Sequence, residues 1–294
     1  MTGPKPGQAS VYETDEPVLY ERRGAVALIS LNRPRYANAQ NAQLTYALDA
    51  AFARAGADDA VGAIILRGEG KHFCSGHDIS SPGDDSDVRR DDRRSLWWDH
   101  STKPGAEFLY AREQEVYLGM CRRWRDLPKP TLAAVQGACI AGGLMLAWVC
   151  DLTVASDDAY FVDPVLRMGV PGVEYFAHAF EMHPRIAREF LFMGEPIDAR
   201  RAYQLGMVNR VTASEDLDAV ALSMATRIAQ APRLAAALAK LAFNHLEDLS
   251  GKRSGMDAVF HMHHLAHAHN QLSGGKPFQE RPNAAPTAAG LKPG

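Results

Sequence analysis

The stretch of residues 129–151 constrains the fold of this chain more than any other. Thr131 to Val135 is a short apolar run set off by prolines, and Gly142-Gly143 opens a second apolar run that is too long and too rich in alanine to be a strand. The pattern predicts a buried strand, then a tight turn, then a buried helix.

A helix that begins at Gly142 presents backbone N–H groups that have no partner within the helix. Glycine has no side chain to shield these groups, and the helix dipole places partial positive charge at the same end. Such a terminus can hold an anion or a developing oxyanion. We therefore expect a binding site for a negatively charged atom at the start of this helix.

Composition excludes several classes of function. The 294 residues carry a net charge of −3 with both signs spread along the chain, which argues against a nucleic-acid partner. No apolar run reaches the roughly 18–20 residues of a membrane span, and the N-terminus lacks the pattern of a signal peptide. We therefore expect a cytoplasmic protein that makes no membrane contact. The four cysteines lie in apolar contexts without metal-binding spacing, as expected for reduced thiols.

The order of elements predicts an α/β fold whose helices gather towards the C-terminus. Residues 17–212 alternate strand and helix patterns and form the expected core, whereas residues 213–272 are helical throughout. We expect residues 1–16 to be disordered and residues 273–294 to form a flexible tail. The chain has no Gly-x-Gly-x-x-Gly turn after a strand and no Walker loop, so no nucleotide cofactor is expected.

Several elements of the core can be placed from their patterns. Residues 18–31 are typical of a β-hairpin, and Asn41 is a suitable cap for the helix that follows. Residues 61–68 are nearly continuous in apolar residues, as in a strand covered on both faces. A helix is expected over residues 174–182.

Five motifs occur in order along the chain. They are Phe73-Cys74-Ser75-Gly76-His77-Asp78-Ile79, then Lys129-Pro130-Thr131 continuing through Gln136-Gly137 to Ala141-Gly142-Gly143, then Cys150-Asp151, then Asp198-Ala199-Arg200-Arg201-Ala202, then Leu205-Gly206-Met207-Val208-Asn209. In this order they resemble the enoyl-CoA hydratase/isomerase (crotonase) superfamily. The resemblance covers roughly residues 17–270 and implies a spiral of ββα units with a helical C-terminal region that associates into a homotrimer or hexamer. It also implies acyl-CoA thioesters as ligands, with coenzyme A as part of the substrate and no other cofactor.

The resemblance implies two hydrogen-bond donors for the thioester oxygen as it becomes an enolate. Carried over by position, these donors are the backbone N–H groups of His77 and Gly142. The implication agrees with the exposed backbone expected at both turns.

The positions of the family's usual acid–base pair differ in this chain. Hydratases that it resembles carry one carboxylate three residues after the glycine donor and a second about twenty residues further on. Here these positions are Met145 and Val165, and neither side chain can move a proton. We therefore expect no ordinary two-carboxylate hydration. Both residues are expected to line the substrate pocket, together with Trp97 and Trp98 from a polar segment that forms either a lid or plain surface.

Two other carboxylates are candidates for the acid–base role. Glu174 follows a Pro-Gly turn at the expected start of a helix, and dienoyl-CoA isomerases and aryl-CoA dehalogenases resemble this pattern in placing a catalytic carboxylate near that loop. Asp163 lies two residues before Val165. Each also has a structural interpretation, because acids are favoured in the first turn of a helix and aspartate is common in turns and caps.

Histidines cluster near the C-terminus, at His261, His263, His264, His267 and His269. His263 and His267 are one helical turn apart and could share a metal ion. The family that the chain resembles needs no metal, so we expect no metal site and a cluster that lines a helical or subunit surface.

Three functions remain open from the sequence. The first is an acyl-CoA enzyme of the enoyl-CoA hydratase/isomerase type, a lyase or isomerase that forms an enolate with unusual acid–base residues. The second is a non-catalytic acyl-CoA-binding homologue. The third, a peptidase on a related fold, is disfavoured because Ser75 lies in a loop and not at a turn that starts a helix.

Overall fold

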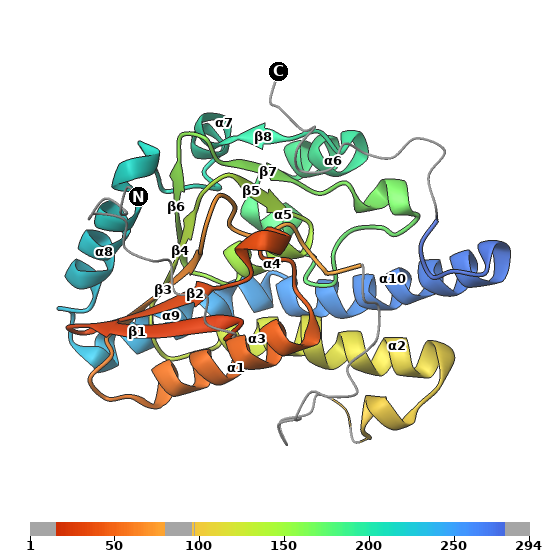
Figure 1. Ribbon diagram of the computed structural model, residues 1–294, viewed down its shortest axis with the longest axis horizontal. Coiled ribbons are helices and arrows are strands. Elements are labelled where there is room, and N and C mark those ends of the chain that lie inside the picture. Colours follow the sequence, from red (N-terminus) through yellow and green to blue (C-terminus); the bar gives the residue numbers. More distant parts are fainter. Residues whose placement is uncertain (1–15, 80–95, 97, 280–294) are drawn as a thin grey trace, which may run out of the picture.

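The computed structural model describes residues 16–79, 96 and 98–279, and there the chain forms two β-sheets surrounded by helices (Figure 1). The larger sheet has the strand order β1-β2-β3-β4-β6-β9. Its strands are Val18–Arg23, Val26–Leu31, Ala63–Gly68, Thr131–Val135, Leu152–Ser156 and Arg210–Thr212. The smaller sheet has the order β5-β7-β8, formed by Ala138–Ile140, Tyr160–Val162 and Ile197–Asp198. The predicted α/β fold is confirmed.

The larger sheet is antiparallel only at its first pair. β1 and β2 form the predicted hairpin, and every other neighbouring pair in this sheet is parallel. All six residues of β2 are buried, as expected for a strand covered on both faces. Along β3 the residues alternate between two apolar cores, with Ile64 and Leu66 in one and Ala63 and Ile65 in the other.

Ten α-helices occur in the described residues. They are α1 Ala42–Ala57, α2 Gly105–Glu113, α3 Met120–Arg125, α4 Gly142–Trp148, α5 His178–Glu181, α6 Pro184–Met193, α7 Ala199–Gln204, α8 Leu217–Ile228, α9 Arg233–Leu249 and α10 Lys252–Gly274. A π-helical segment, Gln114–Gly119, joins α2 to α3. α8 packs on one face of the larger sheet, and α1 and α4 contribute to the core on the other face. Asn41 caps α1 as predicted, because its Oδ1 accepts a hydrogen bond of 3.0 Å from Leu44 N–H.

The stretch of residues 129–151 forms β4, β5 and α4 at the centre of the molecule (Figure 1). The predicted strand and the start of the helix at Gly142 are confirmed. The additional short strand β5 was not predicted. It follows a turn at Gly137, whose φ of +53° favours glycine. α4 is shorter than the apolar run suggests and ends at Trp148.

The predicted helix over residues 174–182 is wrong at its start, because α5 begins only at His178. Ala177 N–H donates to Tyr175 O at 2.9 Å, which closes a turn tighter than an α-helix. The helical interpretation of Glu174 as an acid in a first turn therefore does not hold.

The boundaries at residues 212 and 272 remain predictions, and residues 1–15 and 280–294 lie outside the described part of the chain. α10 crosses the second boundary, since it runs from Lys252 to Gly274. Among the described helices, none combines the length and apolar character that crossing a membrane requires.

Candidate active site

Two backbone turns from distant parts of the sequence meet beside α4. The loop after β3 is held against β5, because Cys74 N–H donates to Ala138 O and Ile140 N–H donates to Cys74 O, each at 3.0 Å. Gly76 follows in this loop with a φ of +99°. A Cβ atom on Gly76 would lie 3.4 Å from Gly142 N, so glycine at this position allows the loop to approach the start of α4.

The backbone amides of His77 and Gly142 belong to the two turns that meet here, and neither has a backbone partner among the described residues. On either side of His77, Gln40 N–H donates to Gly76 O at 2.8 Å and Asp78 N–H donates to Gln40 O at 2.9 Å. Within the described part of the chain, neither His77 N–H nor Gly142 N–H donates to a backbone carbonyl outside its own helix. Both therefore remain able to donate to a bound oxygen atom, and their role as donors stays a prediction.

The imidazole of His77 also belongs to the site. Its ring stacks on the Tyr117 ring with centroids 3.7 Å apart, and it also lies against Gly142, where a Cβ atom would lie 2.6 Å from Cδ2 and Nε2 of the ring. Burial lowers the pKa of His77 to about 3, so the ring is neutral near neutral pH. His77 Nδ1 lies 3.6 Å from Glu174 Oε1, which brings a carboxyl group to the same place.

Glu174 is the carboxyl group that the fold brings to this turn. It follows Gly172, whose φ of +146° turns the chain inward, and its side chain is almost fully buried. Its Oε2 has no hydrogen-bond partner among the described residues. Burial raises the pKa of Glu174 well above its usual range, and the negative charge of Glu113 is the second largest cause of this rise. A carboxylate with a raised pKa is a stronger base, and its acid form is populated closer to neutral pH.

Asp163, the other predicted candidate, is engaged elsewhere. Its Oδ2 lies 2.8 Å from His178 Nε2, and its Oδ1 accepts a hydrogen bond of 3.3 Å from Val165 N–H. The His178 ring in turn packs edge-on against Trp148. Since both oxygens have partners, Asp163 is suited to orienting His178.

The residues expected to line the pocket are mostly buried in the main apolar core. Met145 on α4 is fully buried, and Val165 begins a short 3₁₀ turn after β7. Trp98 is half-buried, whereas Trp97 lies outside the described residues. A separate cavity of about 380 Å³ lies beyond the ends of β3 and β4, between charged side chains, and none of the predicted site residues lines it.

The expectation of a surface cluster of histidines is wrong for three of the five. His263 and His267 are buried, and His264 is largely so, because this face of α10 packs against α2; only His261 and His269 are exposed. The three histidines surround Glu113, the last residue of α2, with Nε2 atoms between 3.1 and 3.8 Å from its Oε2. These histidines hold the pKa of Glu113 below its usual range, against burial, which acts to raise it.

Sequence reasoning missed Glu113 because its partners lie about 150 residues away in the chain. Its local sequence, Arg-Glu-Gln-Glu, is typical of an exposed helical face. The one local signal is that the π-helical segment begins at the next residue, and π-helical turns are frequent at functional sites.

Comparison with known proteins gives a consistent set of relatives. The family model for enoyl-CoA hydratase/isomerase matches residues 21–285. The chain is 41% identical over 257 residues to a putative enoyl-CoA hydratase, EchA13, of Mycobacterium tuberculosis, which covers 86% of this chain and 81% of the relative. It is 31% identical over 226 residues to 4-chlorobenzoyl coenzyme A dehalogenase-2 of an Arthrobacter species, with 74% of each chain covered.

Solved structures match over the same extent. The crystal structure of a probable enoyl-CoA hydratase from Mycobacterium smegmatis has a TM-score of 0.80 and 43% identity, covering 89% of this chain and 99% of that one. A probable enoyl-CoA hydratase from Mycobacterium thermoresistibile has a TM-score of 0.81 and 42% identity at the same coverage.

Proposed function

Because this chain belongs to the enoyl-CoA hydratase/isomerase (crotonase) family, we propose that it acts on an acyl-CoA thioester by stabilising the thioester enolate. The thioester oxygen accepts hydrogen bonds from the N–H groups of His77 and Gly142. Glu174 moves the proton at the carbon next to the thioester carbonyl. Coenzyme A enters as part of the substrate.

One observation supports this proposal, namely that a buried carboxyl group lies next to the side chain of one proposed donor residue. Glu174 Oε1 lies 3.6 Å from His77 Nδ1, and a Cβ atom on Gly142 would lie 2.6 Å from the same ring. Two amides without backbone partners and a carboxyl of raised pKa are what enolate formation requires. The base takes the proton from carbon, the C–H electron pair forms the enolate, and the amides hold the oxygen that becomes negative.

The proposed reaction differs from ordinary hydration. By the resemblance, family members that add water use two carboxylates, at positions that correspond to Met145 and Val165 in this chain. Losing a general acid or base costs roughly 10²–10⁴-fold in rate for each group. We therefore propose proton transfer through Glu174, as in an isomerisation, and expect slow hydration of crotonyl-CoA.

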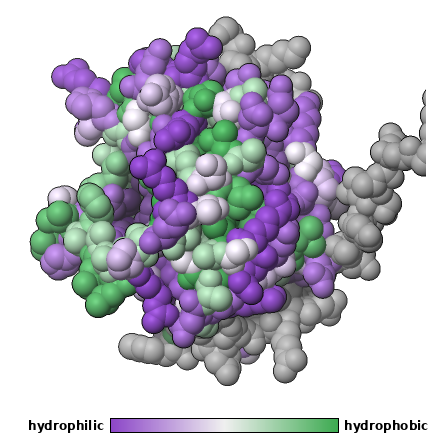
Figure 2. Space-filling view, turned by 90° about the vertical axis from the view of Figure 1, so that its left-hand side faces the viewer, coloured by the Kyte–Doolittle hydropathy of each residue, from purple (hydrophilic) through white to green (hydrophobic). Residues whose placement is uncertain are grey.

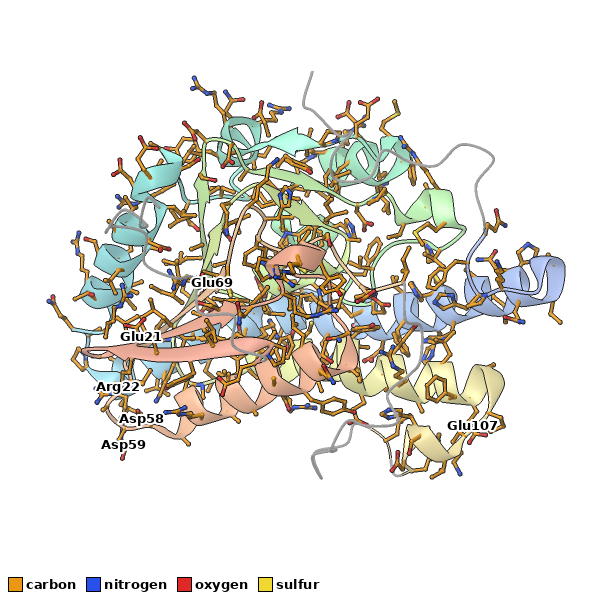
Figure 3. All side chains as sticks on the ribbon, in the orientation of Figure 1. Glu21, Arg22, Asp58, Asp59, Glu69 and Glu107 are labelled. Atoms are coloured by element: carbon orange, nitrogen blue, oxygen red, sulfur yellow. The ribbon has the colours of Figure 1, made fainter. Side chains whose placement is uncertain are left out.

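A panel of saturated, unsaturated and aromatic acyl-CoA thioesters, with crotonyl-CoA included, tests the proposal by calorimetric binding and by turnover. We expect binding of at least one thioester, and for that substrate Glu174→Gln should lower kcat by about 10²–10⁴-fold and leave affinity largely unchanged. Glu107→Gln is the control, because Glu107 lies at the exposed far end of α2 (Figure 3).

Two outcomes would redirect the proposal. Full activity in Glu174→Gln with loss in Asp163→Asn would make Asp163 the base. Thioester binding with no turnover, unchanged by either substitution, would favour a non-catalytic acyl-CoA-binding homologue. Rapid hydration of crotonyl-CoA would contradict the expected difference from ordinary hydratases.

A further inference from the structure

The buried group of Glu113, His263 and His267 lies beside the proposed reaction centre, and none of its three side chains transfers the proton in the proposed reaction. Glu113 is the last residue of α2, and the two histidines lie one turn apart on α10, which runs alongside α2 (Figure 1). Each of the three residues is 3% exposed. One oxygen and two nitrogens from these side chains lie within 4.8 Å of one another.

Hydrogen bonds on the far side of each ring determine which nitrogen faces Glu113 with a lone pair. His263 Nδ1 lies 2.8 Å from Gly172 O, and His267 Nδ1 lies 2.9 Å from Pro277 O. A carbonyl oxygen can only accept, so both Nδ1 atoms carry hydrogen. When both rings are neutral, the two Nε2 atoms therefore present lone pairs to the carboxylate, and either a proton or a metal cation must lie between them to remove the repulsion. Backbone carbonyls that fix a tautomer in this way are typical partners of metal-binding histidines.

The separations between these atoms fit ligands of one ion. Glu113 Oε2 lies 3.8 Å from His263 Nε2 and 3.5 Å from His267 Nε2. Ligands about 2.0–2.2 Å from a tetrahedral ion are separated from one another by about 3.4 Å. None of the three atoms has a hydrogen-bond partner among the described residues, although each is buried. His264 adds a further nitrogen, with Nε2 at 3.1 Å from the same oxygen.

We propose that Glu113, His263 and His267 bind one divalent transition-metal ion, for which Zn²⁺ is the best match. Imidazole nitrogens with a single carboxylate suit zinc and its neighbours in the first transition row, whereas magnesium and calcium prefer oxygen ligands. The ion joins α2 to α10. It also lies beside the proposed acid–base group, because Glu174 Oε1 is 3.8 Å from His263 Nε2.

Metal content and thermal stability test the proposal on the full chain, without reference to substrate or turnover. Protein stripped with a chelator should take up one Zn²⁺ per chain, and a 100-fold excess of Zn²⁺ over Kd should raise Tm by about 5–10 °C. Co²⁺ should occupy the same site and give visible absorption bands of nitrogen and oxygen coordination. Because no acyl-CoA is present, failure of this proposal is distinguishable from failure of the proposed enzymatic function.

Matched substitutions locate the ion. His267→Gln and Glu113→Gln should each abolish the Tm rise and the Co²⁺ bands. His269→Gln and Glu107→Gln should retain both, since these residues lie on the same two helices but are exposed. If wild-type protein gains neither stability from Zn²⁺ nor bands from Co²⁺, a proton bridges the cluster and the proposal is overturned. Equal zinc uptake by wild type and Glu113→Gln would also overturn it, whether or not the variant is less stable.

Discussion

At the scale of single residues, position 142 tolerates a side chain less well than its place in an apolar run suggests. A Cβ atom there would lie 2.6 Å from Cδ2 and Nε2 of His77 and 3.0 Å from Gln40 Nε2. The His77 ring is also stacked on the Tyr117 ring with centroids 3.7 Å apart, which limits how far it can move. The requirement for glycine therefore comes from a neighbouring loop as much as from the turn itself.

Substituting Gly142→Ala should push the His77 ring and displace the proposed amide donor. Overpacking of this kind typically costs about 1–3 kcal/mol in unfolding free energy, and we expect weaker acyl-CoA binding as well. Adding His77→Ala removes the clash and keeps the backbone N–H, so the double variant should recover much of the stability. Urea unfolding of the two single variants and the double variant measures this coupling. Strictly additive effects would show that the ring does not constrain position 142.

Sequence reasoning reaches some of these residues and not others for a physical reason. His77 and Gly142 lie in short motifs whose glycines indicate exposed backbone turns, and the family resemblance then selects these two residues as the donors. Glu174 could be named as a candidate from the Pro-Gly turn before it, although this turn does not start a helix. Glu113 could not be predicted from the sequence. Its histidine neighbours come from the packing of α2 against α10, and neither helix carries a sequence pattern that indicates this contact.

At the scale of elements, three helices are joined by one partly buried arrangement of charges. Glu247 on α9 accepts hydrogen bonds of 2.9 Å from Arg125 at the end of α3 and from Lys252 at the start of α10. Burial acts to raise the pKa of Glu247, but the charges and hydrogen bonds of Lys252 and Arg125 outweigh it, so the pKa is lowered. The folded state therefore favours ionised Glu247.

This pKa shift gives the junction a defined pH dependence. The stabilisation is fully present above the pKa of an unfolded glutamate, about 4.3, and is lost as pH falls through the lower folded value. We expect Glu247→Gln to be less stable than wild type at pH 7 and to lose less stability between about pH 5 and pH 3. Urea unfolding across this range measures it, with Glu107→Gln as the control. Parallel curves for wild type and Glu247→Gln would contradict the prediction.

At the scale of the whole molecule, the fold could be predicted further than the site. The hairpin, β3, β4 and α8 follow from local periodicity and from the rule that strands covered on both faces are continuously apolar. The division into two sheets could not be predicted, because β5 and β8 are only three and two residues long. Such short strands depend on pairing partners and carry almost no pattern of their own.

The apolar residues of the C-terminal helices divide into two groups that the sequence did not separate. On α8, Leu222 and Ile228 pack against the core that covers the larger sheet. The apolar residues of α9 are instead exposed by between 53% and 72%, at Leu234, Leu238, Leu241, Phe243, Leu246 and Leu249. Figure 2 shows apolar residues at the left-hand edge and over the centre of this face, between hydrophilic residues. A surface of this kind on one helix is typical of an interface.

We expect further copies of this chain to cover α9 in a closed trimer or a pair of trimers. Leu234, Leu238 and Leu241 recur at helical spacing and so form one continuous face for a neighbouring chain. Light scattering should give three or six times the chain mass of 32.1 kDa. Leu238→Glu with Leu241→Glu should shift the protein towards monomer, because burying either carboxylate in an apolar interface is costly. Tyr203→Glu is the control, since Tyr203 is an exposed aromatic residue on α7. A wild-type monomer at micromolar concentration would contradict the assembly, and a trimer that survives the double substitution would place the interface elsewhere.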